Sequence, residues 1–197
     1  MKKLFKLAVS VLILVSVVAC SGGTKTKDTL NIGISNTLSG LNPFNASDVA
    51  SQWIMEWMYP KLLEQPSANT FESSLAKEFT TTDSKTFTIK LADAKWSDGV
   101  AITSADVAYT LNLIATPKVE TTLGSYISSL EGVTSAGKLV DGATEISGVK
   151  IVDDKTLTLT TKTPVDINYL KEMIGFSVKI SPKHIVETMD IYNLGQS

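Results

Sequence analysis

The chemistry open to this sequence is limited by its side chains. Among 197 residues there is one cysteine, Cys20, and one histidine, His184. A catalytic nucleophile generally needs a base beside it, yet no serine stands in a nucleophile-elbow setting and no glycine-rich phosphate loop follows a strand. The 20 acidic residues show no spacing typical of a paired-carboxylate hydrolase. We therefore predict that the chain is not an enzyme.

A metal centre and a cofactor are also not expected. Metal sites are built from clusters of histidine, cysteine and carboxylate side chains, and no such cluster stands out in the sequence. His184 follows Ser181-Pro182-Lys183, and proline favours the first turn of a helix. We predict that His184 lies at a helix N-terminus and is not a metal ligand.

Cys20 is predicted to carry a lipid. Three lysines precede an apolar run from Leu7 to Ala19, which is shorter than the ~20 residues of a membrane span and typical of a secretory signal peptide. The run ends in Val-Val-Ala-Cys, which resembles a bacterial lipobox, although leucine is more common at the position of Val17. Residues 1–19 are then removed and Cys20 becomes a lipidated first residue. The alternative is a chance cysteine beside a cleavage site that lies elsewhere.

The residues after the cysteine are predicted to act as a tether. Residues 20–28 are rich in serine, glycine, threonine and lysine, a composition typical of flexible linkers. A single cysteine used for anchoring leaves no thiol for a disulfide within one chain. We expect an exported protein, extracellular or periplasmic, that a lipid anchor holds at the outer face of the membrane without spanning it.

The charge of the chain argues against nucleic acid as a partner. Without residues 1–19 the chain has 15 lysines, no arginine and 20 acidic residues, a net charge of −5. Phosphate backbones are bound by basic stripes, and none is present. The lack of arginine also excludes a bidentate guanidinium clamp on a carboxylate from this segment.

Apolar spacing predicts mixed α and β structure. Alternation over residues 30–34 predicts a strand that runs into a loop at residues 37–43. Residues 48–59 are predicted to form a helix capped by Ser47 and ended by Pro60. Trp53 and Trp57 are predicted to lie in the core, and stacking on a ligand is the alternative. Further elements are two hairpins, 79–82 with 86–91 and 149–152 with 156–160, a helix after Thr103 that ends near Thr116, a helix over 166–173, a strand near 176–180 and a helix opened by Ser181. Residues 131–148 are expected to be a polar surface excursion.

Residues 76–113 carry the most specific signal. They read AKEFTTTDSKTFTIKLADAKWSDGVAITSADVAYTLNL, in which a hairpin is followed by Lys-Trp-Ser-Asp-Gly at 95–99, by Thr103 and by Ala-Asp-Val at 105–107. This passage closely resembles the signature region of extracellular solute-binding protein family 5. The family includes the oligopeptide-, dipeptide- and nickel-binding components of ABC importers.

The resemblance implies an α/β, periplasmic-binding-protein-like type II fold. It assigns residues 29–50 and 172–197 to parts of a first lobe and residues 51–171 to a smaller inserted lobe. Because family members are much longer, it also implies that the fold is incomplete in this chain, that the C-terminal lobe is absent and that residues 20–197 alone bind peptide weakly or not at all.

The resemblance further implies a substrate-binding lipoprotein of an ABC importer. Such a protein captures peptides, or a similar small solute, for delivery to the permease subunits. Nickel or haem is less favoured, since no ligand cluster is present. The alternative is a surface peptide receptor or adhesin with no transport role, which the sequence does not separate from an importer subunit.

Two groups of residues acquire expected roles. In the family the loop after the first strand lies near the ligand, which points to Thr37, Leu38 and Ser39, whose backbone groups could pair with an extended peptide; an ordinary strand-to-helix loop is the alternative. The signature residues are expected to be structural. Asp98 and Gly99 form a turn, Trp96 anchors the hairpin to the following helix, and Thr103 with Asp106 caps that helix.

Overall fold

The computed structural model describes residues 31–34 and 37–189. The chain divides into two compact units, residues 1–35 and 36–197. The predicted signal peptide, Cys20 and the spacer over 20–28 lie outside the described residues, as do residues 190–197. In the described part of the first unit, Asn31 to Ile34 form no strand, so the predicted strand over 30–34 is wrong there. Alternation alone is insufficient, because a strand also needs a paired neighbour.

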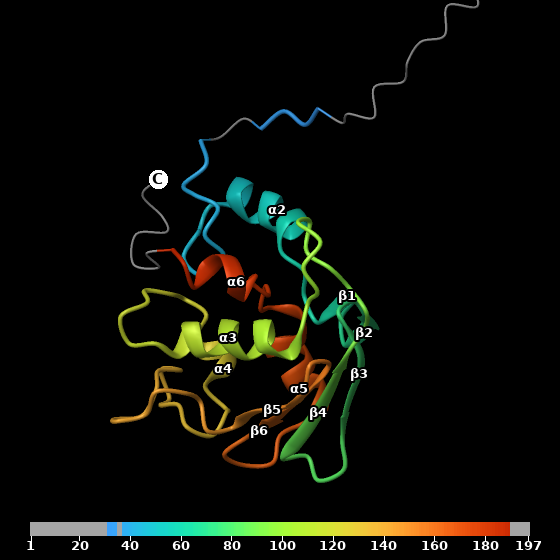
Figure 1. Ribbon diagram of the computed structural model, residues 1–197, viewed down its shortest axis with the longest axis vertical. Helices are drawn as coiled ribbons and strands as arrows, with labels where there is room; N and C mark the ends of the chain where they lie inside the picture. The colour runs from blue at the N-terminus through green and yellow to red at the C-terminus, as the bar shows by residue number, and fades with distance from the viewer. Residues whose placement is uncertain (1–30, 35–36, 190–197) are drawn as a thin grey trace, which may run out of the picture. The chain divides into compact units, whose positions relative to one another are not determined.

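A four-stranded antiparallel sheet forms the base of the second unit (Figure 1). Its strands, in spatial order, are β3 (Ala76–Thr81), β4 (Thr86–Leu91), β6 (Thr156–Thr160) and β5 (Val149–Asp153). Both predicted hairpins are therefore confirmed. The pairing of β4 with β6 brings the hairpins together, and it aligns Phe87 with Leu159 and Ile89 with Leu157.

The sheet has one apolar and one polar face, as alternating strands predict. Phe87, Ile89 and Leu91 of β4 are fully buried, as are Leu157 and Leu159 of β6. Threonines alternate with them, and the register sets Thr80, Thr88 and Thr158 side by side on the opposite face. Burial of the apolar face drives the packing of the sheet against the helices.

Helix α3 (Ser104–Ala115) covers the apolar face and lies between the sheet and α6 (Lys183–Val186) (Figure 1). It begins after Thr103 and ends before Thr116, as predicted. The Thr103 N–H donates to Asp106 Oδ2 at 2.8 Å, which is the carboxylate half of a capping box. Val107, Leu111 and Ile114 are fully buried within the core.

Helix α2 (Val49–Met58) ends at Tyr59, before Pro60, as predicted, but its cap and its faces differ from the prediction. Asp48, one residue after Ser47, accepts the capping bond from the N–H of Ser51 at 2.8 Å. Trp53 and Trp57 are 66% and 71% exposed, so their predicted place in the core is wrong. The buried residues of α2 are Ala50, Ser51 and Met55. The prediction followed the spacing of the large indoles, which lie on a different face of the helix.

The chain after the sheet returns to α2 through irregular structure. Helix α5 (Ile167–Leu170) continues into a π-helix (Lys171–Phe176). The observed helical segment therefore extends beyond the predicted range of 166–173 and includes the first residue of the strand predicted near 176–180. Within residues 176–180 only a bridge from Lys179 to Lys61 has strand pairing. A short hairpin, β1 (Leu63–Ser67) and β2 (Thr70–Ser73), follows α2 and was not predicted.

Residues 131–148 are more than a surface excursion. Val133 and Ile146 are buried, and the Lys138 ammonium donates to the carbonyl oxygens of Ile114, Thr116 and Val119 at 3.1, 3.2 and 2.7 Å. The segment packs on α4 (Gly124–Ile127) through the close approach of two glycines at positions 124 and 137. It therefore closes the C-terminal end of α3.

No helix within the described ranges has the length and apolarity needed to cross a membrane.

Candidate functional site

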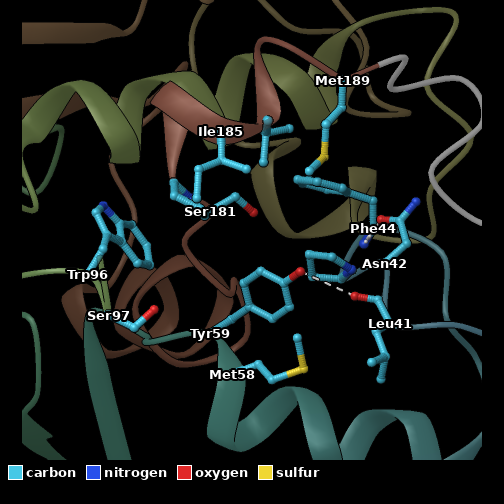
Figure 2. Close-up of a pocket in the computed structure, with 13 residues that line it drawn as sticks. Leu41, Asn42, Phe44, Met58, Tyr59, Trp96, Ser97, Ser181, Ile185 and Met189 are labelled. Atoms are coloured by element: carbon cyan, nitrogen blue, oxygen red, sulfur yellow. Dashed lines mark hydrogen bonds between the residues drawn. The ribbon is translucent and has the colours of Figure 1, made fainter. Parts of the chain in front are cut away.

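A pocket of about 370 Å³ lies where α2, α6, the loop before α2 and the turn after β4 meet (Figure 2). This volume falls within the range of small-molecule sites. Its thirteen lining residues come from four separate segments: Leu41, Asn42, Pro43, Phe44, Met58, Tyr59, Trp96, Ser97, Ser181, Pro182, Ile185, Val186 and Met189.

The lining of the pocket is mostly apolar and carries no charged side chain. No Asp, Glu, Lys or His side chain is among the lining residues. Two flexible methionines, Met58 and Met189, lie on different walls, and methionine adapts its shape to what it contacts. An ionised ligand group would lose hydration here without gaining a partner, so the pocket suits an apolar group.

One wall is the loop that leads into α2. The Tyr59 hydroxyl donates to the Leu41 carbonyl at 3.2 Å, which joins the end of α2 to this loop (Figure 2). Burial raises the pKa of Tyr59 above its ordinary value. The buried Asn42 accepts the Phe44 N–H at 2.9 Å, an Asx turn that directs the Phe44 ring into the core.

The predicted ligand-binding residues lie just before this wall. Thr37 and Leu38 are exposed. The Ser39 N–H donates to Asp48 Oδ2 at 3.1 Å, and the Ser39 hydroxyl bonds to the same oxygen. Of the three residues proposed from sequence, Ser39 therefore has its backbone donor already engaged. None of them lines the pocket.

The opposite wall is the signature turn. The Gly99 N–H donates to the Trp96 carbonyl at 2.9 Å, and Gly99 has φ of +90°, a left-handed conformation that favours glycine. Asp98 accepts the Val100 N–H at 3.0 Å and lies 2.7 Å from His184 Nε2 on α6. The hydrogen bond from His184 holds the pKa of Asp98 below its usual range.

Trp96 is half-buried and packs against the core, and it also lines the pocket (Figure 2). The sequence predicted only a structural anchor at this position. The pocket contact could not be foreseen, because the other segments that line the pocket are distant from Trp96 in the chain on both sides.

The floor of the pocket depends on Asp106. Its Oδ1 accepts the Lys183 N–H at 2.9 Å and its Oδ2 accepts the Thr103 N–H at 2.8 Å, so one buried carboxylate fixes the starts of α6 and α3. The Ser181 N–H donates to Thr110 Oγ1 at 3.0 Å. Asp106 thus positions the pocket without lining it.

Charged groups are paired outside the pocket. Glu56 of α2 contacts Lys61 at 2.7 Å and Lys179 at 2.6 Å. Burial opposes ionisation of Glu56, but the bonds from Lys179 and Lys61 outweigh it and lower its pKa. The Lys61 ammonium also lies 4.2 Å from the centre of the Phe176 ring, a cation–π contact. Among the described residues, no group of three or more histidine, cysteine or acidic side chains could hold a metal ion.

Comparison with known proteins identifies the family. Residues 70–192 match the family described as bacterial extracellular solute-binding proteins, family 5 Middle. The chain belongs to this family. The match covers more than half of the chain and includes both hairpins of the four-stranded sheet, α3 and α6.

Individual relatives agree with this assignment. The chain is 27% identical over 164 residues to the periplasmic oligopeptide-binding protein OppA of Escherichia coli, which covers 82% of this chain and 30% of that protein. The substrate-binding domain of an oligopeptide ABC transporter from Bacillus anthracis superposes with a TM-score of 0.71 at 23% identity, over 83% of this chain and 32% of the other. NikZ from Campylobacter jejuni, solved in complex with Ni(L-His), superposes with a TM-score of 0.64 at 19% identity, over 86% and 31%.

These likenesses establish the expected fold class. The described residues have an α/β fold that corresponds to part of a type II periplasmic binding protein. The chain spans about a third of the length of the relatives that it matches.

Proposed function

We propose that this protein is the solute-binding component of an ABC importer and that it captures peptides outside the cytoplasmic membrane. Membership of solute-binding protein family 5 carries the proposal. Peptide is preferred to a metal chelate because the OppA relative is an oligopeptide-binding protein and because the pocket lining contains no histidine or acidic side chain.

The pocket and the neighbouring loop supply two complementary contacts in this proposal. The exposed backbone of Thr37 and Leu38 pairs with the main chain of an extended peptide, which gives affinity without sequence preference. The apolar pocket takes a side chain, which gives selectivity. Ser39 contributes by fixing the loop to α2 through Asp48, and its N–H is not available to the ligand.

Capture is proposed to use lobe closure. Residues 29–50 and 172–197 belong to one lobe and residues 51–171 to a smaller lobe inserted into it. The two lobes exchange between an open and a closed form. A ligand that binds the closed form more strongly than the open form shifts this equilibrium towards the closed form. The closed form then docks on the permease.

The protein is proposed to be a lipoprotein held by Cys20. The lipobox-like sequence before the cysteine supports this assignment. Metabolic labelling with palmitate should mark the normal protein and leave Cys20→Ser unlabelled. Equal label in both would show that Cys20 is not the anchor.

The test of peptide capture is affinity selection followed by a transport assay. The full protein is incubated with a mixed library of two- to six-residue peptides, and bound species are identified by mass spectrometry. We expect peptides to be retained and their uptake to stop in cells that lack the gene. Failure to retain any peptide of the library would contradict the proposal. Peptide retention with uptake unchanged would favour a surface receptor or adhesin.

A further inference from the structure

The pocket contains a buried hydroxyl that has no partner. Ser181 is 0% exposed, and its Oγ has no hydrogen-bond partner among the described residues. Figure 2 shows its hydroxyl directed towards the middle of the pocket, between Tyr59 and Phe44. A buried polar atom left unpaired is costly, so this hydroxyl requires an explanation.

The backbone gives Ser181 little freedom to satisfy its hydroxyl elsewhere. Its N–H is held by Thr110 Oγ1 at 3.0 Å, and the next residue, Pro182, has a fixed φ and precedes α6. The neighbouring Ile180 N–H donates to the Pro60 carbonyl at 2.8 Å. The segment is therefore fixed at both ends, and the hydroxyl lies on its pocket side in Figure 2.

The surroundings of the hydroxyl define what can reach it. Phe44, Ile185 and Val186 offer apolar contact, and the described pocket lining offers no charge. A group that fills this space must be apolar over most of its surface and must carry one neutral hydrogen-bonding atom at its tip. Among peptide side chains, the phenol of tyrosine has this form.

We propose that the pocket is a selectivity site for a tyrosine side chain of the bound peptide, with the phenolic hydroxyl paired to Ser181 Oγ. This inference rests on the proposed function, because it requires a peptide ligand. The aromatic ring lies among the apolar residues of the pocket, and Met58 and Met189 adjust around it. The Ser181 hydroxyl can donate or accept, so it suits a phenol in either orientation.

The experiment compares matched peptides on the full protein by titration calorimetry. Trialanine is compared with peptides in which tyrosine, phenylalanine, lysine or glutamate replaces each alanine in turn. At one position we expect tyrosine to bind about five- to tenfold more tightly than phenylalanine, as one added neutral hydrogen bond predicts. Lysine and glutamate at that position should bind more weakly than alanine. Equal affinity for tyrosine and phenylalanine at every position would overturn the inference.

Two variants locate the effect. Ser181→Ala should remove the tyrosine preference and leave the affinity for phenylalanine peptides unchanged. Without ligand, this variant should have a melting temperature no lower than that of the wild-type protein, because it loses only an unpaired hydroxyl. Ser97→Ala is the matched control, since Ser97 lines the same pocket but is exposed, and it should retain the preference. A preference that survives in Ser181→Ala would overturn the inference.

The outcomes separate this inference from the proposed function. If peptides bind without a tyrosine preference, capture of peptides stands and the selectivity site fails. If no peptide in the series binds, the proposed function fails and the selectivity site with it.

Discussion

Ser39 donates its backbone N–H to Asp48 Oδ2 at 3.1 Å, while Asp48 Oδ1 accepts the N–H of Ser51 at 2.8 Å. The residue that caps α2 therefore also holds the loop that precedes the helix. This loop contains the residues that the family resemblance places near a ligand, and it continues into one wall of the pocket. The position of the proposed binding loop thus depends on one half-buried carboxylate.

This arrangement makes stability depend on pH at the acid end. The side-chain hydrogen bond from Ser39, followed by those from Ser51, holds the pKa of Asp48 well below its ordinary value of 3.8. A carboxyl group whose pKa is lowered by folding stabilises the protein above its unfolded pKa, and the contribution is lost as the pH falls below that value. We expect Asp48→Asn to lower the melting temperature at pH 7. The difference in melting temperature between this variant and the wild-type protein should become smaller as the pH falls below 3.8. A difference that stays constant from pH 7 to about pH 2 would contradict this account.

The exposed tryptophans of α2 should contribute little to stability. Trp53→Ala and Trp57→Ala should each change the free energy of unfolding by about 0.5 kcal/mol or less, as is usual for surface sites. Met55→Ala on the same helix should cost roughly 2–5 kcal/mol, because Met55 is only 2% exposed and its loss leaves a cavity. Urea unfolding of the three variants checks the difference. A loss of more than about 2 kcal/mol in either tryptophan variant would place that side chain in the core after all.

The contact between two glycines should be sensitive to a single methyl group. A Cβ at Gly137 would lie 1.9 Å from the Gly124 carbonyl oxygen, and Gly137 has φ of +71°. Gly142 is a matched control, because it has φ of +78° with nothing within 4 Å of its Cβ position. Gly142→Ala should cost roughly 1–2 kcal/mol from backbone strain alone, and Gly137→Ala should cost distinctly more. Equal melting temperatures for the two variants would show that the close contact is not required.

Lys138 is expected to stabilise the C-terminal end of α3. Its ammonium donates to three backbone carbonyls, and desolvation lowers its pKa. Lys138→Met keeps the aliphatic stem and removes the donors, so it should cost about 1–3 kcal/mol through the unpaired carbonyls. Lys150→Met, at an exposed site on β5, should have almost no effect. Amide hydrogen exchange should rise in the last turn of α3 only in the first variant; unchanged protection there would contradict the role.

The sequence predicted structure best where the interacting residues are close together in the chain. The hairpins 79–82 with 86–91 and 149–152 with 156–160 could be predicted because alternation and turn residues act within a few positions. The cap at Thr103 and the end of α2 at Pro60 depend on neighbouring residues in the same way.

The remaining features depend on contacts between distant residues. The pocket could not be predicted, since its walls come from residues 41–44, 58–59, 96–97 and 181–189. The exposure of Trp53 and Trp57 was missed because apolar spacing does not say which side of a helix has a partner. His184 was expected at a helix N-terminus, and the start of α6 at Lys183 confirms this; its contact with Asp98, 86 positions away, gave no sequence signal.

The most direct test of the account is the fluorescence of Trp96 during a peptide titration. This sequence has three tryptophans, and replacing the exposed Trp53 and Trp57 by phenylalanine leaves Trp96, which lines the pocket, as the one indole within it. We predict that tyrosine-containing peptides shift the Trp96 emission saturably, with the same dissociation constant that calorimetry gives. Peptide binding seen by calorimetry with no change in Trp96 emission would place the ligand elsewhere and contradict the account.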